Sequence, residues 1–543
     1  MTTTPTPTPA PASTRGPTSA LTGTGPLLRL ALRADRWRIV VWALAVAWLT
    51  VVSVQSYDDL FGTPELLASR ATLISSPAAT AMAGPGYGLD DYTLGALVAN
   101  ELALWVMIPV AIMAVLAVTR HLRQPEEDGR LELVRSAPVG AAAPVVAGLL
   151  AAAVGVLAVG ATTFVGLLTT DLDPAGSALM CASVVVVALV LAGASAVASQ
   201  LAGHARAASS LGMAAIGVAF VLRAVGDVRG PQSTSVWTWL SPFGWSQATA
   251  PYTENRWWPL AIGLVATTVS VAVAFALAGR RDLGRGLLHE RPGRATGRLR
   301  GVVGLTWRRQ RTSILSWAAA VVLCGALVGL LADAITDFVA DQPTFDELFG
   351  AGDPTASAFA LYSVFLGVLA FAYATTAVGA VHAEEVSGRG ATLLALPVQR
   401  TRWLGAQVGL AAVAAAVMLL VAGLVMGLTA AASLGDTSRI APLVGAAAVT
   451  IPGVLCVLGV AVLVLGLVPR AFVVVWAYVA YVGVMAMFGD ILPDGADAGS
   501  PFTYLPALPA DPMSWPPVVA CTLVALVAVA LGLAAFRRRD LQA

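Results

Sequence analysis

Long apolar stretches alternate with shorter polar ones along most of the chain. A bilayer core takes about 20 apolar residues of helix. Because lipid offers the backbone no hydrogen-bond partner, each stretch of that length is predicted to be a helix. Twelve spans are predicted, at residues 37–57, 97–119, 139–169, 177–202, 207–225, 258–278, 314–332, 356–381, 404–434, 440–468, 471–489 and 516–536. The predicted fold class is therefore all-α, a polytopic membrane protein.

The composition agrees with a membrane protein. Of the 543 residues, 57% are hydrophobic and 12% are charged, and the mean hydropathy is +0.79. Soluble domains carry about 25% charged residues, so a soluble enzyme, a disordered protein and a nucleic-acid binder are excluded. All 32 basic residues are arginine. The phosphate-binding motif GxxxxGK(S/T) requires a lysine, so the chain is predicted not to be an enzyme that hydrolyses ATP through it.

The cysteines and histidines give no sign of a cofactor in this chain. Cys181, Cys324, Cys456 and Cys521 lie singly within apolar runs, and the four histidines are scattered. Because there is no CxxC motif and no Cys/His cluster, neither disulfides nor a metal site is predicted.

The arginines are distributed unequally between the polar segments. With both termini inside, 27 arginines and 10 acidic residues are cytoplasmic, whereas 4 arginines and 20 acidic residues are external. The positive-inside rule therefore predicts cytoplasmic termini in the cell membrane. Residues 1–26 begin with a Thr/Pro-rich run that lacks the apolar core of a signal peptide. They are predicted to be a disordered cytoplasmic tail.

Several sequence signals occur twice, in the same order. Arg-Arg-Asp-Leu follows the sixth span at 280–283 and the twelfth at 538–541, and Ser-Pro-Phe precedes those spans at 241–243 and 500–502. We interpret this pattern as a duplication of six helices, with halves at 27–283 and 303–543 and a cytoplasmic linker at 284–302. Six is an even number, so the two copies are predicted to have the same orientation, as in a parallel repeat.

The most informative repeat follows the second span of each half. A Glu-x-x-Gly-Arg unit precedes a Pro-Val pair in both places, and its shared positions are Glu126, Gly129, Arg130, Glu385, Gly388 and Arg389. Glu and Arg have the spacing of a helical ion pair, and glycine permits close backbone approach. Short amphipathic cytoplasmic helices are therefore predicted at 126–135 and 385–394. The simpler interpretation is a solvated loop that only fixes topology.

These repeated motifs resemble those of actinobacterial ABC exporter permeases. That group is the fused, twelve-span type-2 exporter class, which includes tetronasin, polyketide-antibiotic and multidrug efflux permeases. The resemblance covers about residues 27–541. It implies that the six shared positions belong to coupling helices that dock on two copies of a separate ABC ATPase, which holds the ATP and Mg²⁺. It also implies a hydrophobic small-molecule cargo and short re-entrant helices between the fifth and sixth spans.

Two basic segments precede the first span of each half, at 27–37 and 303–311. Their mixture of arginine with Leu or Trp fits interfacial helices on the inner leaflet. The resemblance implies that such a connecting helix also touches the ATPase. Simple anchoring to anionic lipid remains an alternative.

Three charged residues lie in or beside predicted spans. Glu101 lies about a turn inside the second span, and Arg223 and Asp227 lie four residues apart near the outer end of the fifth. Charge exposed to lipid is costly. Arg223 and Asp227 are therefore predicted to form a structural ion pair, and Glu101 is predicted to face the protein interior. A contact with cargo remains a further possibility for all three.

Three functions are compatible with these signals: the membrane subunit of an ABC exporter, a proton-coupled transporter of the major-facilitator type, and a non-transporting scaffold. A secondary transporter needs a protonatable residue in its core, and Glu101 is the one acidic residue placed within a span. The duplicated cytoplasmic segments also favour the first function. A neighbouring gene encoding an ATPase with GxxxxGK(S/T) would separate it from the second.

Overall fold

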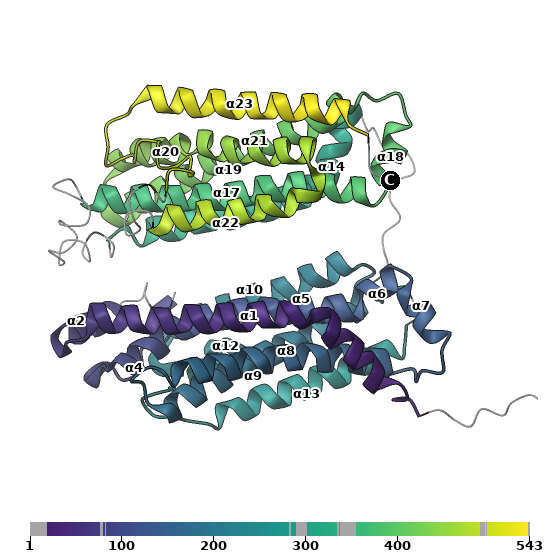
Figure 1. Cartoon of the computed structure of the whole chain (residues 1–543). Helices are drawn as coiled ribbons and strands as arrows, with labels where there is room; N and C mark the ends of the chain where they lie inside the picture. Colours follow the sequence, from purple (N-terminus) through teal and green to yellow (C-terminus); the bar gives the residue numbers. More distant parts are fainter. Residues whose placement is uncertain are drawn as a thin grey trace, which may run out of the picture. The chain divides into compact units, whose positions relative to one another are not determined.

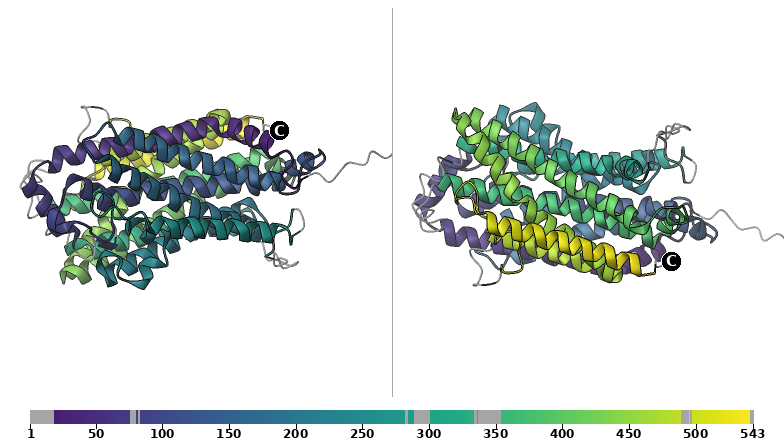
Figure 2. Two further views of the ribbon diagram at one scale, coloured as in Figure 1. Left: turned by 90° about the horizontal axis from the view of Figure 1, so that it is seen from below. Right: turned by 90° about the horizontal axis from the view of Figure 1, so that it is seen from above.

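The computed structural model describes residues 19–75, 80–81, 83–281, 284–288, 301–333, 336, 354–488, 495 and 497–540. Within these ranges the regular structure consists of helices, with no strand. The chain divides into two compact units, Met1–Gly293 and Arg294–Ala543. In each unit the long helices run side by side (Figures 1 and 2).

The described residues of the first unit form six long helices and several short ones. The long helices are α1 (Thr24–Phe61), α5 (Ala103–Leu122), α8 (Ala143–Leu167), α9 (Pro174–Leu201), α10 (Ala205–Arg229) and α13 (Pro259–Ala278). The short ones are α2 (Pro64–Ile74), η1 (Leu89–Asp91), α4 (Leu94–Leu97), η2 (Val98–Leu102), α6 (Gln124–Glu127), α7 (Arg130–Arg135), η3 (Pro231–Ser233), α11 (Val236–Trp239) and α12 (Pro242–Gln247). Figure 1 shows α6 and α7 at one end of the unit and α2 and α4 at the other.

The second unit contains the long helices α14 (Gly301–Leu330), α17 (Pro354–Val386), α19 (Arg400–Leu434), α21 (Ile451–Leu467), α22 (Phe472–Phe488) and α23 (Trp515–Arg538). Its shorter helices are α18 (Arg389–Leu394), η4 (Thr437–Arg439), α20 (Ile440–Val449) and η5 (Pro469–Ala471). The predicted span 440–468 is divided between α20 and α21, since Pro452 lies in the first turn of α21 and cannot continue the backbone hydrogen bonds of the preceding helix.

Eleven helices of the described residues are long and apolar enough to cross a bilayer. The predicted span 471–489 corresponds to α22, whose 17 residues extend about 26 Å, slightly less than the thickness of a typical hydrocarbon core. The all-α membrane fold is confirmed, and the count of twelve spans stays a prediction.

Corresponding helices pack together in the two units. In the first unit α1 lies along α8, α5 contacts α8 and α9, and α13 lies along α9. In the second unit α14 lies along α19, α17 contacts α19 and α21, and α23 lies along α21. A Cβ atom on Gly466 of α21 would lie 2.3 Å from the carbonyl oxygen of Gly532 in α23. Small residues therefore allow this pair of helices to approach closely.

Two boundaries differ from the predictions. Residues 1–18 of the predicted tail lie outside the described residues, but α1 already begins at Thr24, and the carbonyls of Ala20 and Thr22 accept hydrogen bonds from Ala142 and Gly140. The predicted interfacial segments 27–37 and 303–311 belong to the first turns of α1 and α14, and their position on the inner leaflet stays a prediction. Figure 1 shows α1 changing direction toward its N-terminal end.

Candidate functional site

The repeated Glu-x-x-Gly-Arg motif folds in a similar way in both units. The chain leaves α6 or α17, turns at glycine and enters α7 or α18. Gly129 and Gly388 have φ angles of 72° and 73°, in the left-handed region that favours glycine. A Cβ atom on either would meet nothing within 4 Å. These glycines therefore serve the turn, and close approach of their backbone to a partner stays a prediction.

Glu126 is buried in an ion-pair cluster, which we call the first clamp: Glu126, Arg123 and Arg281. Its side chain is 5% exposed. Arg281 approaches it with both terminal nitrogens, Nη1 lying 2.7 Å from Oε2, and Arg123 Nη1 lies 2.6 Å from the same oxygen. The predicted pair between Glu126 and Arg130 is wrong, because Gly129 interrupts the helix between them. Arg130 instead pairs with its exposed neighbour Asp128.

The first clamp joins several helix ends. Arg281 Nε donates to Gln200 Oε1 at the end of α9 (2.7 Å), and Arg123 Nε donates to the carbonyl of Gly203 (3.1 Å). Next to the clamp, Glu127 Oε2 accepts from the backbone N–H of Ala205 (2.9 Å), the first residue of α10. The short segment α6 is therefore bound to the ends of α9, α10 and α13.

The second unit has an equivalent ion pair, the second clamp, formed by Glu385 and Arg539. Glu385 is 4% exposed, and Arg539 binds both of its oxygens, with Nη2 lying 2.6 Å from Oε2. Arg400, the first residue of α19, donates to the carbonyl of Arg539 (2.7 Å). The adjacent Glu384 pairs with Arg309 of α14. The side chain of Arg389 lies outside the described residues, so its pairing with Glu385 stays a prediction.

Arg281 and Arg539 are the functional candidates that the sequence reasoning missed. Each is the second arginine of a repeated Arg-Arg-Asp-Leu motif, and each binds the glutamate of the repeated Glu-x-x-Gly-Arg motif of its own half. The signal that could have revealed the contact is the joint repetition of an acidic and a basic motif on the same predicted side of the membrane.

A cavity of about 300 Å³ lies beside the first clamp. Glu126 and Arg281 form part of its wall, and Leu131 of α7 and Phe275 of α13 contribute apolar surface. The cavity therefore lies between the short helix α7 and the end of the sixth long helix.

At the opposite end of the first unit, Glu101 is buried and paired. It lies in η2, a π-helical turn, and is 7% exposed. Arg70 of α2 binds it, with Nε 2.9 Å from Oε1 and Nη2 2.5 Å from Oε2. The neighbouring Asn100 forms two hydrogen bonds with the backbone of Tyr87. Its Oδ1 accepts from the Tyr87 N–H (3.1 Å), and its Nδ2 donates to the Tyr87 carbonyl (2.9 Å). The prediction that Glu101 faces the protein interior is confirmed, and its partner Arg70 is a residue that the sequence did not connect with it.

Arg223 and Asp227 form the predicted ion pair. Nη1 of Arg223 lies 3.3 Å from Oδ2 of Asp227, and neither side chain is exposed. Arg223 also donates to the carbonyl of Ala81 (2.7 Å), and Thr238 donates to Asp227 (2.9 Å). The pair thus connects α10 to the segment before Tyr87 and to α11.

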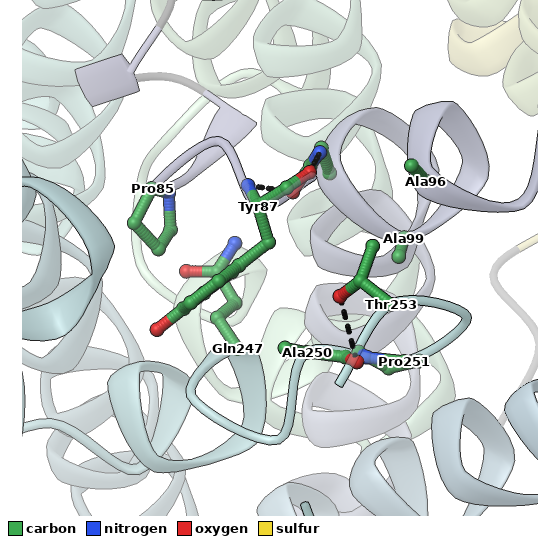
Figure 3. Close-up of a pocket in the computed structure, with 9 residues that line it drawn as sticks. Pro85, Tyr87, Ala96, Ala99, Gln247, Ala250, Pro251 and Thr253 are labelled. Carbon is green, nitrogen blue, oxygen red and sulfur yellow. Dashed lines mark hydrogen bonds between the residues drawn. The ribbon is translucent and has the colours of Figure 1, made fainter. Parts of the chain in front are cut away.

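The segment between the fifth and sixth long helices folds back into the first unit. Ser241 and Ser246 donate to carbonyls of α10 and α9, and Phe243 of α12 is fully buried. A cavity of about 10 Å³ lies here, lined by Tyr87, Asn100, Gln247 and neighbouring residues (Figure 3). It has room for about one water molecule, so it is too small for a cargo molecule. Burial raises the pKa of the Tyr87 phenol, which donates to Ser233.

Comparison with known proteins identifies relatives of this chain. Residues 299–537 match the family described as multidrug efflux system permease Rv1217c, C-terminal domain. The multidrug efflux system permease protein Rv1217c of Mycobacterium tuberculosis is 33% identical over 541 residues, covering 96% of each chain. The chain belongs to the actinobacterial ABC exporter permeases. Membership in this permease family favours a transport subunit over the major-facilitator alternative.

Proposed function

We propose that the chain is the transmembrane subunit of an ABC-type exporter that moves hydrophobic or amphipathic compounds, such as drugs or antibiotics, out of the cell. The observation that carries the proposal is the 33% identity to a multidrug efflux permease along almost the whole chain. ATP is bound with Mg²⁺ and hydrolysed in a separate ABC ATPase subunit, present in two copies. The permease itself performs no hydrolysis and lies in the cell membrane with both termini in the cytoplasm.

The short helices α7 and α18 are the proposed docking elements, one for each ATPase copy. Support comes from their position after the second long helix of each unit and from the exposed polar and apolar side chains on α7, among them Arg130 and Leu133. Glu126 and Glu385 hold the base of each docking element inside the clamps. Of the predicted docking residues, Arg130 is therefore better placed than either glutamate to meet a partner.

The test uses inside-out membrane vesicles that contain the permease and its ATPase, with ethidium as the transported probe. We expect ethidium uptake to require ATP, to be inhibited by vanadate and to persist when a protonophore collapses the proton gradient. A proton-coupled transporter would give the opposite pattern, with uptake abolished by the protonophore and unaffected by vanadate. Mass measurement of the purified complex checks the expected ratio of one permease to two ATPases.

A further inference from the structure

We propose that the two Glu–Arg contacts, Glu126–Arg281 and Glu385–Arg539, are positioning pairs that transmit movement of α7 and α18 to the sixth long helix of each unit. This inference rests on the proposed function, because the movement comes from the ATPase. It gives the repeated glutamates a role that differs from direct contact with the partner.

The geometry of both pairs is suited to transmission. Arg281 lies three residues beyond the end of α13, and Arg539 directly follows α23. Each guanidinium donates two hydrogen bonds to one carboxylate. Such a bidentate pair fixes orientation as well as distance. A displacement of the segment that carries the glutamate therefore acts directly on the end of the last helix.

The last helices of the two units are also the least buried of the candidate spans. Of the eleven candidate spans in the described part of the chain, α13 and α23 have the lowest buried fractions, 17% and 11%. Each packs mainly along one neighbour, α9 or α21. Because each of these helices is held mainly along one side, an ion pair at its end gives it a second point of attachment to its unit. In the first unit, the 300 Å³ cavity next to the clamp gives α7 room to move.

The surroundings of the two pairs differ, but the pairs themselves are the same. Arg123 and Gln200 complete the first clamp, whereas Arg400 and the Arg309–Glu384 pair surround the second. If each pair served only to stabilise the fold around it, we would expect these different neighbours to be accompanied by different ion pairs in the two units. The common element is the bond between the docking segment and the end of the sixth long helix.

A charge exchange in the second clamp tests the proposal. The variants are Glu385→Arg, Arg539→Glu and the two combined, with Arg538→Glu as a matched control, because Arg538 is the exposed last residue of α23, directly before Arg539. Each permease is purified with its ATPase, and vanadate-sensitive ethidium transport is measured in vesicles.

We expect each single variant to retain bound ATPase and to lose transport by about tenfold, while the double variant recovers to within about threefold of the native rate. The control should transport at the native rate. Native rates in the single variants, or a folded, ATPase-bound double variant as inactive as the singles, would overturn the proposal. If native vesicles show no ATP-dependent transport, the proposed function fails rather than this inference.

Neutral variants provide a second route if a charge-reversed protein does not fold. Glu385→Gln, Arg539→Gln and their combination each remove the same interaction. We expect the double loss to equal either single loss, which is the non-additive result for directly interacting partners. Losses that multiply would show that the two residues act independently and would contradict the proposal.

Discussion

The first unit buries charges at both of its ends, but the two sets are organised differently. At the end away from α6 and α7, Arg223 and Asp227 belong to one helix and are completed by carbonyls and hydroxyls of the covering segments. At the other end, Glu126 is bound by an arginine 155 positions away. The Arg223–Asp227 pair has no charged counterpart within α22, the fifth long helix of the second unit, whereas the clamp occurs in both units.

This difference separates two uses of a buried ion pair. Arg223 and Asp227 hold a local fold of the first half, and the described helix α22 has no such pair. The clamps connect the end of the second long helix to the end of the sixth in each half, and they lie beside the proposed docking helices. Charges present once are therefore expected to affect stability, and charges present twice are expected to affect coupling between the ATPase and transport.

The largest expected effect on stability is at Arg223. Replacing Arg223 with Met leaves Asp227 buried without its ion partner, and removal of one member of a buried pair costs about 3–5 kcal/mol. We expect a marked fall in the temperature at which the detergent-purified protein loses its monodisperse peak. Arg229→Met, at the exposed end of the same helix, is the control and should shift stability by about 0.5 kcal/mol or less. Equal unfolding temperatures in the two variants would show that the buried Arg223–Asp227 pair does not stabilise the fold more than an exposed arginine does.

The next effect compares the two clamps. Among the described side chains, Arg539 supplies the guanidinium that binds both oxygens of Glu385, and Arg539→Gln removes it, whereas Arg281→Gln leaves Glu126 with Arg123. We expect transport to fall more with Arg539→Gln than with Arg281→Gln, by about threefold, given coupling energies of about 0.5–3 kcal/mol between contacting residues.

In the double variant Arg123→Gln with Arg281→Gln, Glu126 loses both arginines of the first clamp. Its transport rate should therefore fall to that of Arg539→Gln. Transport in vesicles provides the measurement for all three proteins. A larger loss from Arg281→Gln alone than from Arg539→Gln would show that Arg123 gives no support to the first clamp.

A smaller effect is expected at the turning glycines. Gly129→Val or Gly388→Val forces a β-branched side chain into the left-handed region, at a cost of about 1–2 kcal/mol, although the space around each glycine is open. Asparagine tolerates this conformation better, so Gly129→Asn should retain more bound ATPase than Gly129→Val when the two complexes are purified side by side. Equal losses of bound ATPase in the two variants would show that any side chain is harmful at this position. They would contradict a role for Gly129 that depends on its left-handed backbone conformation.

The smallest effect on stability is expected from Arg130→Ala. Arg130 and Asp128 form an exposed pair, and such pairs contribute about 0–1 kcal/mol. If α7 docks on the ATPase, the variant should keep the native unfolding temperature and bind less ATPase in a pull-down. Native binding at every salt concentration would remove Arg130 from the docking surface.

The sequence was sufficient for those features that depend on local patterns. Apolar length predicted the long helices. The repeated motif predicted short helices at 126–135 and 385–394, and the structure has their later parts as α7 and α18, after the turns at Gly129 and Gly388. The Arg223–Asp227 pair followed from helical spacing and the cost of lipid-exposed charge.

The contacts that define the clamps could not be predicted in this way. Glu126 and Arg281 meet because α5 and α13 both pack on α9 and end at the same level, and spacing along the chain carries no information on that. Helical spacing instead suggested Arg130, and the left-handed turn at Gly129 invalidates that choice. The Arg70–Glu101 contact likewise depends on how α2 returns to the bundle.

The most direct test of transmission through the clamp is a distance within the second unit. Spin labels at Thr392→Cys on α18 and Ala534→Cys on α23, both exposed positions, are measured by pulsed electron resonance after the four native cysteines are replaced with alanine. The complex is compared without nucleotide and with ATP and vanadate. We expect a single narrow distance in both states of the native clamp, because α18 and the end of α23 move together, and a change in that distance on adding nucleotide when Glu385 is replaced with Gln. A distance that changes with nucleotide in the native clamp as much as in Glu385→Gln would contradict transmission through the ion pair.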